Sequence, residues 1–160
     1  MSPQSRYVLL AVEDNPADVK LLRYALSHSA IPVDMYAVED GAEALAFLQR
    51  QEPYTTAPPP HLLLLDVNLL KMHGHEVLAE IKADPQLKQL PVIMFSTSAE
   101  PEDIDRSYQL GANAYLTKPL MLEDYLTLVH QLVQFWGQTA VLPQVNAPQN
   151  RLYNRISLVL

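Results

Sequence analysis

The stretch that decides the fold is His61-Leu62-Leu63-Leu64-Leu65-Asp66. Four consecutive leucines, preceded by three prolines and followed by a carboxylate, predict a short strand that is buried on both faces, as in the middle of a parallel sheet. Ligands of an open α/β sheet bind beyond the carboxyl ends of its strands, which is where Asp66 lies. Taken alone, the segment fits a helix N-cap or a turn aspartate better, so the neighbouring segments must decide.

The composition is typical of one domain with a hydrophobic core. The chain has 160 residues, 49% of them hydrophobic. It has no cysteine, which excludes disulfides, thiolate metal sites and a thiol nucleophile. It has no apolar stretch of membrane-spanning length and no signal-peptide pattern, so we expect a cytoplasmic protein. The net charge of −7, with scattered basic residues, argues against nucleic-acid binding.

Four further apolar runs predict strands, and a helical signal follows each of them. The runs are Tyr7–Val12, Val33–Ala37, Pro91–Phe95 and Ala114–Thr117. Helices are expected from Pro16, from the capping box Asp40-Gly41-Ala42-Glu43, over Glu76–Ala83, from Pro101 to Gly111, and over Leu122–Trp136. Five strands alternating with helices predict an α/β protein with a doubly wound, five-stranded parallel sheet in a single domain.

Three local expectations concern the third and fourth helices. Gly74 is expected to break the chain before the third helix. Ile104 and Tyr108 are expected to share one side of the fourth helix. His73 and His75 are interpreted as solvated turn histidines rather than a metal pair, because nothing else in the sequence completes a ligand set.

Polar residues follow the carboxyl ends of four predicted strands: Glu13, Asp14, Asp66, Ser96 and Lys118. Three carboxylates at one sheet edge oppose each other's ionisation, and a hard divalent cation such as Mg²⁺ resolves this conflict. Lys118 adds a point charge suited to a phosphoryl oxygen, and Ser96 adds a hydroxyl donor. The set therefore predicts a pocket that receives a phosphoryl group on a carboxylate.

These residues, together with Gly74, Gly111-Ala112 and Lys118-Pro119, resemble the receiver domain of two-component response regulators over roughly Tyr7 to Gln138. The resemblance implies a flavodoxin-like (βα)₅ fold for residues 1–138, followed by a tail, 139–160, without an output domain. It implies a phosphorelay in which Asp66 accepts a phosphoryl group from a partner histidine kinase. The protein is then expected to catalyse only its own phosphorylation, rather than to act as an enzyme, and to signal through protein contacts.

The same resemblance implies roles for the individual site residues. It assigns direct Mg²⁺ binding to Asp14, Asp66 and the carbonyl of Asn68, with Glu13 acting largely through water. Tyr115 resembles the aromatic switch residue that turns inward when Ser96 moves onto the phosphoryl group. Both switch residues also have structural interpretations, as a half-buried aromatic and a strand-end hydroxyl.

Within the family, the chain most resembles single-domain regulators encoded beside cyanobacterial phytochromes. The features are the Pro-rich insertion before the third strand, Asp84-Pro85-Gln86-Leu87-Lys88, Phe135-Trp136 and Leu142-Pro143. A phytochrome-type kinase is therefore the expected partner. Two positions depart from the family: Leu70 stands where proline is usual, and His73 where a small polar or acidic residue is usual. Leucine at 70 removes a fixed φ from the loop that presents the Asn68 carbonyl.

The last helix has a wide apolar face. Its stripe toward the sheet is Leu122, Tyr125, Leu126, Val129, Leu132, Val133 and Trp136. Met121, Leu128 and Phe135 recur every seven residues along one shoulder, which predicts a homodimer through these residues. Cover by a neighbouring helix or by the tail is the alternative. In the tail, Leu152, Ile156 and Leu158 fit an added strand, a segment over an apolar face, or disorder.

Three other classes of protein share parts of this sequence pattern. A dehalogenase-type phosphatase needs a second aspartate two residues after the nucleophile, where this chain has Asn68. A flavodoxin needs a phosphate loop rich in hydroxyls and glycine where this chain has Glu13 and Asp14. A pseudo-receiver, which keeps the fold for protein binding without phosphorylation, stays open as an alternative because of Leu70 and His73.

Overall fold

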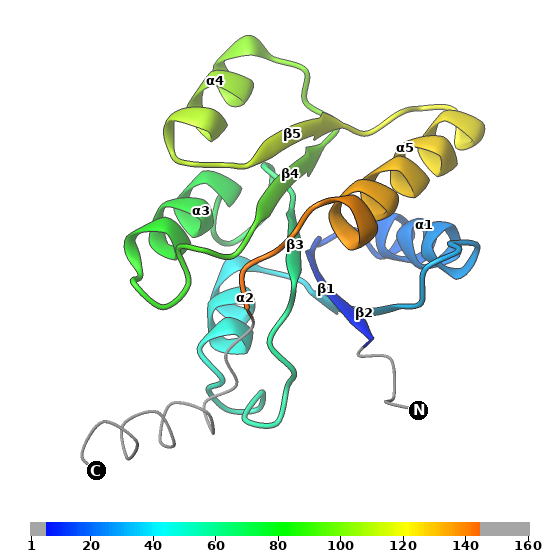
Figure 1. The fold of residues 1–160 in the computed structure, drawn as a ribbon. Helices are drawn as coiled ribbons and strands as arrows, with labels where there is room; N and C mark the ends of the chain where they lie inside the picture. The colour runs from blue at the N-terminus through cyan, green and yellow to red at the C-terminus, as the bar shows by residue number, and fades with distance from the viewer. Residues whose placement is uncertain (1–5, 145–160) are drawn as a thin grey trace, which may run out of the picture.

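Five parallel strands in the order β2-β1-β3-β4-β5 form the central sheet of the computed structural model, which describes residues 6–144. The strands are β1 (Tyr7–Val12), β2 (Val33–Val38), β3 (Leu62–Leu65), β4 (Val92–Ser96) and β5 (Ala114–Thr117). The helices are α1 (Pro16–Ser27), α2 (Gly41–Leu48), α3 (Gly74–Ala83), α4 (Pro101–Gln109) and α5 (Leu122–Gln134). Figure 1 shows α1 and α5 on one face of the sheet and the other helices on the opposite face. The predicted doubly wound, flavodoxin-like fold is confirmed.

The four leucines of β3 supply core side chains to both faces of the sheet. Leu63 and Leu65 join the apolar cluster packed with α2 and α3, and Leu62 and Leu64 join the cluster packed with α1 and α5. None of the four is more than 2% exposed. Because β3 lies between β1 and β4 and is covered on both faces, its sequence is continuously apolar rather than alternating.

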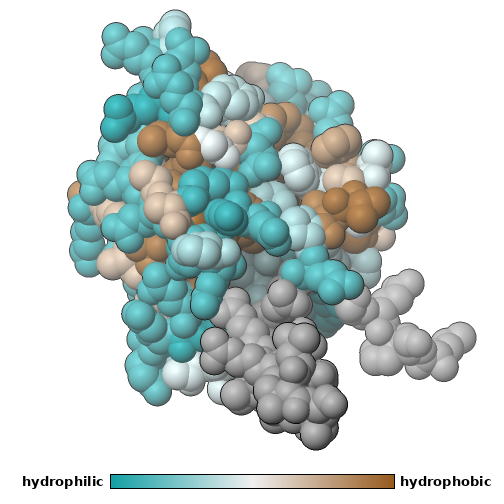
Figure 2. All heavy atoms as spheres, turned by 60° about the vertical axis from the view of Figure 1, so that its left-hand side comes forward, coloured by the Kyte–Doolittle hydropathy of each residue, from teal (hydrophilic) through white to brown (hydrophobic). Residues whose placement is uncertain are grey.

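The face of the molecule formed by α3 and α4 is mostly hydrophilic, with small separate apolar spots (Figure 2). In helix α4 the buried residue is the polar Ser107. Tyr108, which the helical spacing places on the same side as Ile104, is 50% exposed. Its hydroxyl accepts the N–H of Tyr115 at 3.1 Å, which holds the ring at the outer side of the edge strand β5. Ile104 is half-buried.

Helix α3 begins at Gly74, two residues earlier than predicted, so this glycine is helical and does not break the chain. A Cβ on Gly74 would lie 2.1 Å from the carbonyl oxygen of Asp66 and 2.9 Å from the Cα of Val67. The Gly74 N–H donates to the Val67 carbonyl at 2.9 Å. Glycine therefore lets the helix start directly against the strand end that carries Asp66.

His75 is buried between α3 and α4, which corrects its interpretation as a solvated turn histidine. Its side chain is 4% exposed, and Nε2 lies 2.9 Å from the hydroxyl of Ser107. That hydroxyl donates to the Asp103 carbonyl at 2.7 Å, so the imidazole must be the donor at Nε2. Burial and the charge of His73 lower the pKa of His75. The half-buried His73 is the N-cap of α3 and accepts the His75 N–H at 3.3 Å.

Helix α5 continues into a π-helical turn, Phe135–Thr139, and the predicted boundary at 138/139 falls inside this turn. The buried residues of α5 are Tyr125, Val129, Leu132 and Val133. Leu122, predicted to face the sheet, is the first residue of the helix and is 51% exposed. Pro143 and Gln144 line a cavity of about 330 Å³ at the sheet edge where β3 starts.

The predictions for Leu152, Ile156 and Leu158 lie outside the described residues. Over residues 6–144, no helix is both long enough and apolar enough to cross a membrane.

Candidate functional site

Hydrogen bonds at the ends of the strands fix three site residues at one edge of the sheet. The N–H of Glu13 donates to a carbonyl of β2 at 3.0 Å, and that of Asp66 to a carbonyl of β1 at 3.2 Å. The N–H of Lys118 donates to a carbonyl of β4 at 2.7 Å. Glu13, Asp66 and Lys118 are each the first residue after a strand, β1, β3 and β5 respectively. Their side chains therefore leave the sheet at its carboxyl edge.

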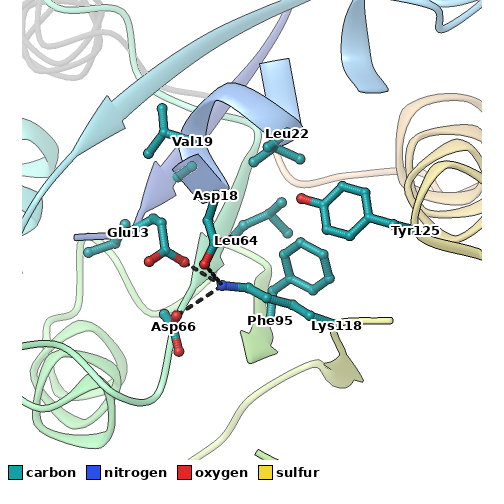
Figure 3. Close-up of a pocket in the computed structure, with 11 residues that line it drawn as sticks. Glu13, Asp18, Val19, Leu22, Leu64, Asp66, Phe95, Lys118 and Tyr125 are labelled. Atoms are coloured by element: carbon teal, nitrogen blue, oxygen red, sulfur yellow. Dashed lines mark hydrogen bonds and ion pairs between the residues drawn. The ribbon is translucent and has the colours of Figure 1, made fainter. Parts of the chain in front are cut away.

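Lys118 lies between the carboxylates and joins them. Its Nζ donates to Glu13 and, at 3.0 Å, to Asp66, and it lies 3.4 Å from an oxygen of Asp18 (Figure 3). Glu13, Asp66 and Lys118 are each 8% exposed. The ammonium also lies 5.5 Å from the centre of the Phe95 ring. The structure thus brings three of the predicted site residues into one buried ion cluster.

The charges of this cluster are set by burial and by mutual contact. Burial and the hydrogen bond with Asp66 raise the pKa of Glu13 to about 7. Burial alone would lower the pKa of Lys118, but the hydrogen bond with Glu13 and the charges of Asp66 and Glu13 raise it above its ordinary value. Lys118 therefore stays charged and compensates the carboxylates around it.

Asp14 does not join this ion cluster. Its Oδ2 accepts the N–H of Leu70 at 3.0 Å, while Asp66 Oδ1 accepts the N–H of Asn68 at 3.2 Å. No three His, Cys, Asp or Glu side chains of the described part of the chain are grouped to hold a metal ion. The prediction that three carboxylates crowd together is therefore wrong, because Lys118 lies between two of them and Asp14 contacts the β3–α3 loop.

The kinds of donor present still fit Mg²⁺. Asp14 and Asp66 follow the adjacent strands β1 and β3, and Asn68 belongs to the loop that contacts both carboxylates. Mg²⁺ in proteins is commonly held by one or two carboxylates and keeps several waters, so it does not require a closed set of three side chains.

Ser96 and Tyr115 both contact the loop that follows β4. Ser96 is fully buried, and its hydroxyl accepts the N–H of Ser98 at 3.2 Å. Tyr115 is half-buried, and its hydroxyl donates to the Ser98 carbonyl at 2.8 Å. Ser98 was not singled out from the sequence, although it ends the hydroxyl-rich stretch Ser96-Thr97-Ser98. It connects the two predicted switch residues.

Asp18 is the site residue that the sequence reasoning missed. It lies in the first turn of α1, whose N-cap Asn15 accepts the N–H of Ala17 at 2.9 Å. An acidic residue in a first helical turn is ordinarily explained by the helix dipole, so it attracts no functional interpretation. The available signal was position: α1 starts three residues after Glu13, so its first turn lies at the same sheet edge.

Comparison with protein-family models matches residues 9–130 to the response regulator receiver domain. Response regulator Rcp1 of Synechocystis sp. is 45% identical over 136 residues, which cover 85% of this chain and 92% of Rcp1. The crystal structure of the phosphorylated cyanobacterial phytochrome response regulator RcpA matches with a TM-score of 0.84 at 44% identity, covering 88% of this chain and 100% of that chain. The Mn²⁺-bound form of Rcp1 matches with a TM-score of 0.81 at 44% identity, covering 86% and 99%. On these matches, and with the sheet order and strand-end residues described above, the chain belongs to the response regulator receiver domain family.

Proposed function

We propose that the protein is a phospho-accepting response regulator, with residues 1–138 as the receiver unit and Asp66 as the phosphoacceptor. The observation that carries this proposal is the buried contact of 3.0 Å between Lys118 Nζ and Asp66. A carboxylate oxygen of Asp66 forms a bond to phosphorus while the bond to the kinase histidine breaks; with a proton on its other ring nitrogen, the histidine leaves as a neutral imidazole. Such a transfer depends mainly on positioning and charge compensation, and Lys118 is placed to contact the phosphoryl oxygens.

Asp14, Asp66 and the Asn68 carbonyl bind Mg²⁺ in this proposal, and Glu13 acts through water. The bound cation would add positive charge beside the phosphoryl oxygens. Support comes from the donor types at this edge of the sheet and from the Mn²⁺-bound form of Rcp1. After phosphorylation, Lys118 contacts a phosphoryl oxygen instead of the Asp66 carboxylate.

Ser96 and Tyr115 carry the response to phosphorylation. The hydroxyl of Ser96 moves to the phosphoryl group and gives up its contact with the Ser98 N–H. Because Tyr115 contacts the carbonyl of the same residue, this movement changes the packing of the ring. The partner is a histidine kinase of the phytochrome type, which the names of the relatives support.

The protein forms a homodimer through the region of Met121, Leu128 and Phe135. Met121 is 68% exposed and Phe135 51%, whereas Leu128 is half-buried and packs on the core. We expect Phe135→Asp to shift sedimentation toward the monomer, because a charge in an apolar interface is unfavourable. Tyr24→Asp, which alters an aromatic side chain of similar exposure, 49%, on α1, is the control. An unchanged profile for Phe135→Asp would remove this interface.

Incubation with Mg²⁺ and acetyl phosphate, followed by intact mass measurement, tests the proposed function. The wild type should gain one phosphoryl group, and Asp66→Asn should gain none. Asp105→Asn, which removes an exposed carboxylate of α4, should behave as the wild type. An adduct on Asp66→Asn would contradict the assignment. Continuous release of phosphate without an adduct would indicate a phosphatase, and no adduct on the wild type would indicate the pseudo-receiver.

A further inference from the structure

We propose that the backbone N–H of Leu70 positions the carboxylate of Asp14 for binding a divalent cation. The contact that points to this role is the hydrogen bond of 3.0 Å from Leu70 N to Asp14 Oδ2, between residues 56 positions apart in the chain. The inference rests on the proposed function, in which Asp14 is a cation ligand.

The exposed side chain of Leu70 does not explain why residue 70 lies at the site. It is 89% exposed, whereas its neighbour Leu69 is 8% exposed and anchors the loop in the core. Residue 70 therefore contributes to the site through its backbone N–H. Proline, which has no N–H, cannot make this contact.

The loop that carries this amide is held at three points. Asp66 Oδ1 accepts the N–H of Asn68 at 3.2 Å, and at the far end of the loop the Gly74 N–H donates to the Val67 carbonyl at 2.9 Å. The Leu70–Asp14 hydrogen bond is the third point. Because the loop is fixed on both sides of Leu70, its amide is a fixed donor, and the Asp14 carboxylate is oriented by the loop rather than free to rotate.

The hydrogen bond is compatible with cation binding. A carboxylate oxygen accepts more than one contact, and the second oxygen of Asp14 does not take part in the bond to Leu70. A neutral N–H cannot replace a cation, but it can hold the carboxylate in one orientation. Hydrogen bonds to ligating carboxylates have this effect, and their loss typically weakens metal binding about 10- to 100-fold.

Titration with Mn²⁺, following the free ion by electron paramagnetic resonance, measures binding without reference to phosphorylation. Leu70→Pro should bind Mn²⁺ about tenfold more weakly than the wild type. Leu70→Ala keeps the amide and removes most of the exposed side chain, so it should bind as the wild type does. In an Asp14→Ala background, adding Leu70→Pro should have no further effect.

Equal affinity of Leu70→Pro and the wild type, or an equal loss in Leu70→Ala, would overturn the inference. If the wild type itself binds no Mn²⁺, the proposed cation site fails instead. Amide hydrogen exchange gives a second test that does not need the proline variant to fold. Asp14→Ala should speed exchange at the Leu70 amide about tenfold, and unchanged exchange would show that the hydrogen bond has no role.

Discussion

Replacing Gly74 with alanine is expected to lower the free energy of unfolding by about 3 kcal/mol, near the upper end for overpacking by one methyl group. The added Cβ would lie 2.1 Å from the Asp66 carbonyl oxygen and 2.9 Å from the Val67 Cα. Both are backbone atoms at the end of a central strand, so neither can move without disturbing the sheet. Urea unfolding followed by circular dichroism measures the loss.

Gly137→Ala is the matched control. A Cβ at Gly137 would meet the end of the Ile31 side chain at 3.3 Å, and a flexible methyl group can move by a few tenths of an ångström. A small change is therefore expected for Gly137→Ala. Equal losses for the two variants would show that the close approach of α3 to the Asp66 backbone does not limit the fold.

Replacing Lys118 with methionine is expected to slow phosphorylation of Asp66 by about 10²- to 10³-fold, the usual loss when one preorganised electrostatic group is removed. Lys118 contacts Asp66 at 3.0 Å in a buried site, where water cannot take over its charge. Methionine keeps a similar length and apolar stem but has no ammonium. Time-resolved intact mass measurement with a small phosphodonor gives the rate.

Lys71→Met is the control for this substitution. Lys71 makes an ion pair with Asp40 on the same side of the sheet, but its side chain is 80% exposed. Its loss should leave the rate within about twofold of the wild type, because exposed pairs contribute little. Similar rates for Lys118→Met and the wild type would contradict the role given to Lys118.

The fold was predictable from the sequence because it follows from local patterns. The apolar run Leu62–Leu65 specifies a central strand, and the cap at Asn15 and the capping box at Asp40 give helix starts that the structure confirms. The same patterns placed Glu13 and Lys118 at strand ends, and parallel topology brings such ends to one edge.

The details that the sequence did not reveal depend on contacts between distant segments. The early start of α3 at Gly74 depends on its approach to the Asp66 carbonyl. The burial of His75 depends on a hydroxyl 32 residues away. The orientation of Asp14 depends on a main-chain N–H in another loop. No periodicity or motif encodes these distances.

Identification of the phosphorylated residue tests the central claim most directly. The phosphorylated protein is treated with borohydride, which reduces an aspartyl phosphate to homoserine, and is then digested and sequenced by mass spectrometry. We expect homoserine at position 66 and at no other acidic residue. Homoserine at Asp14, or an unmodified residue 66 in protein that carries a phosphoryl group, would contradict the assignment of Asp66 as the acceptor.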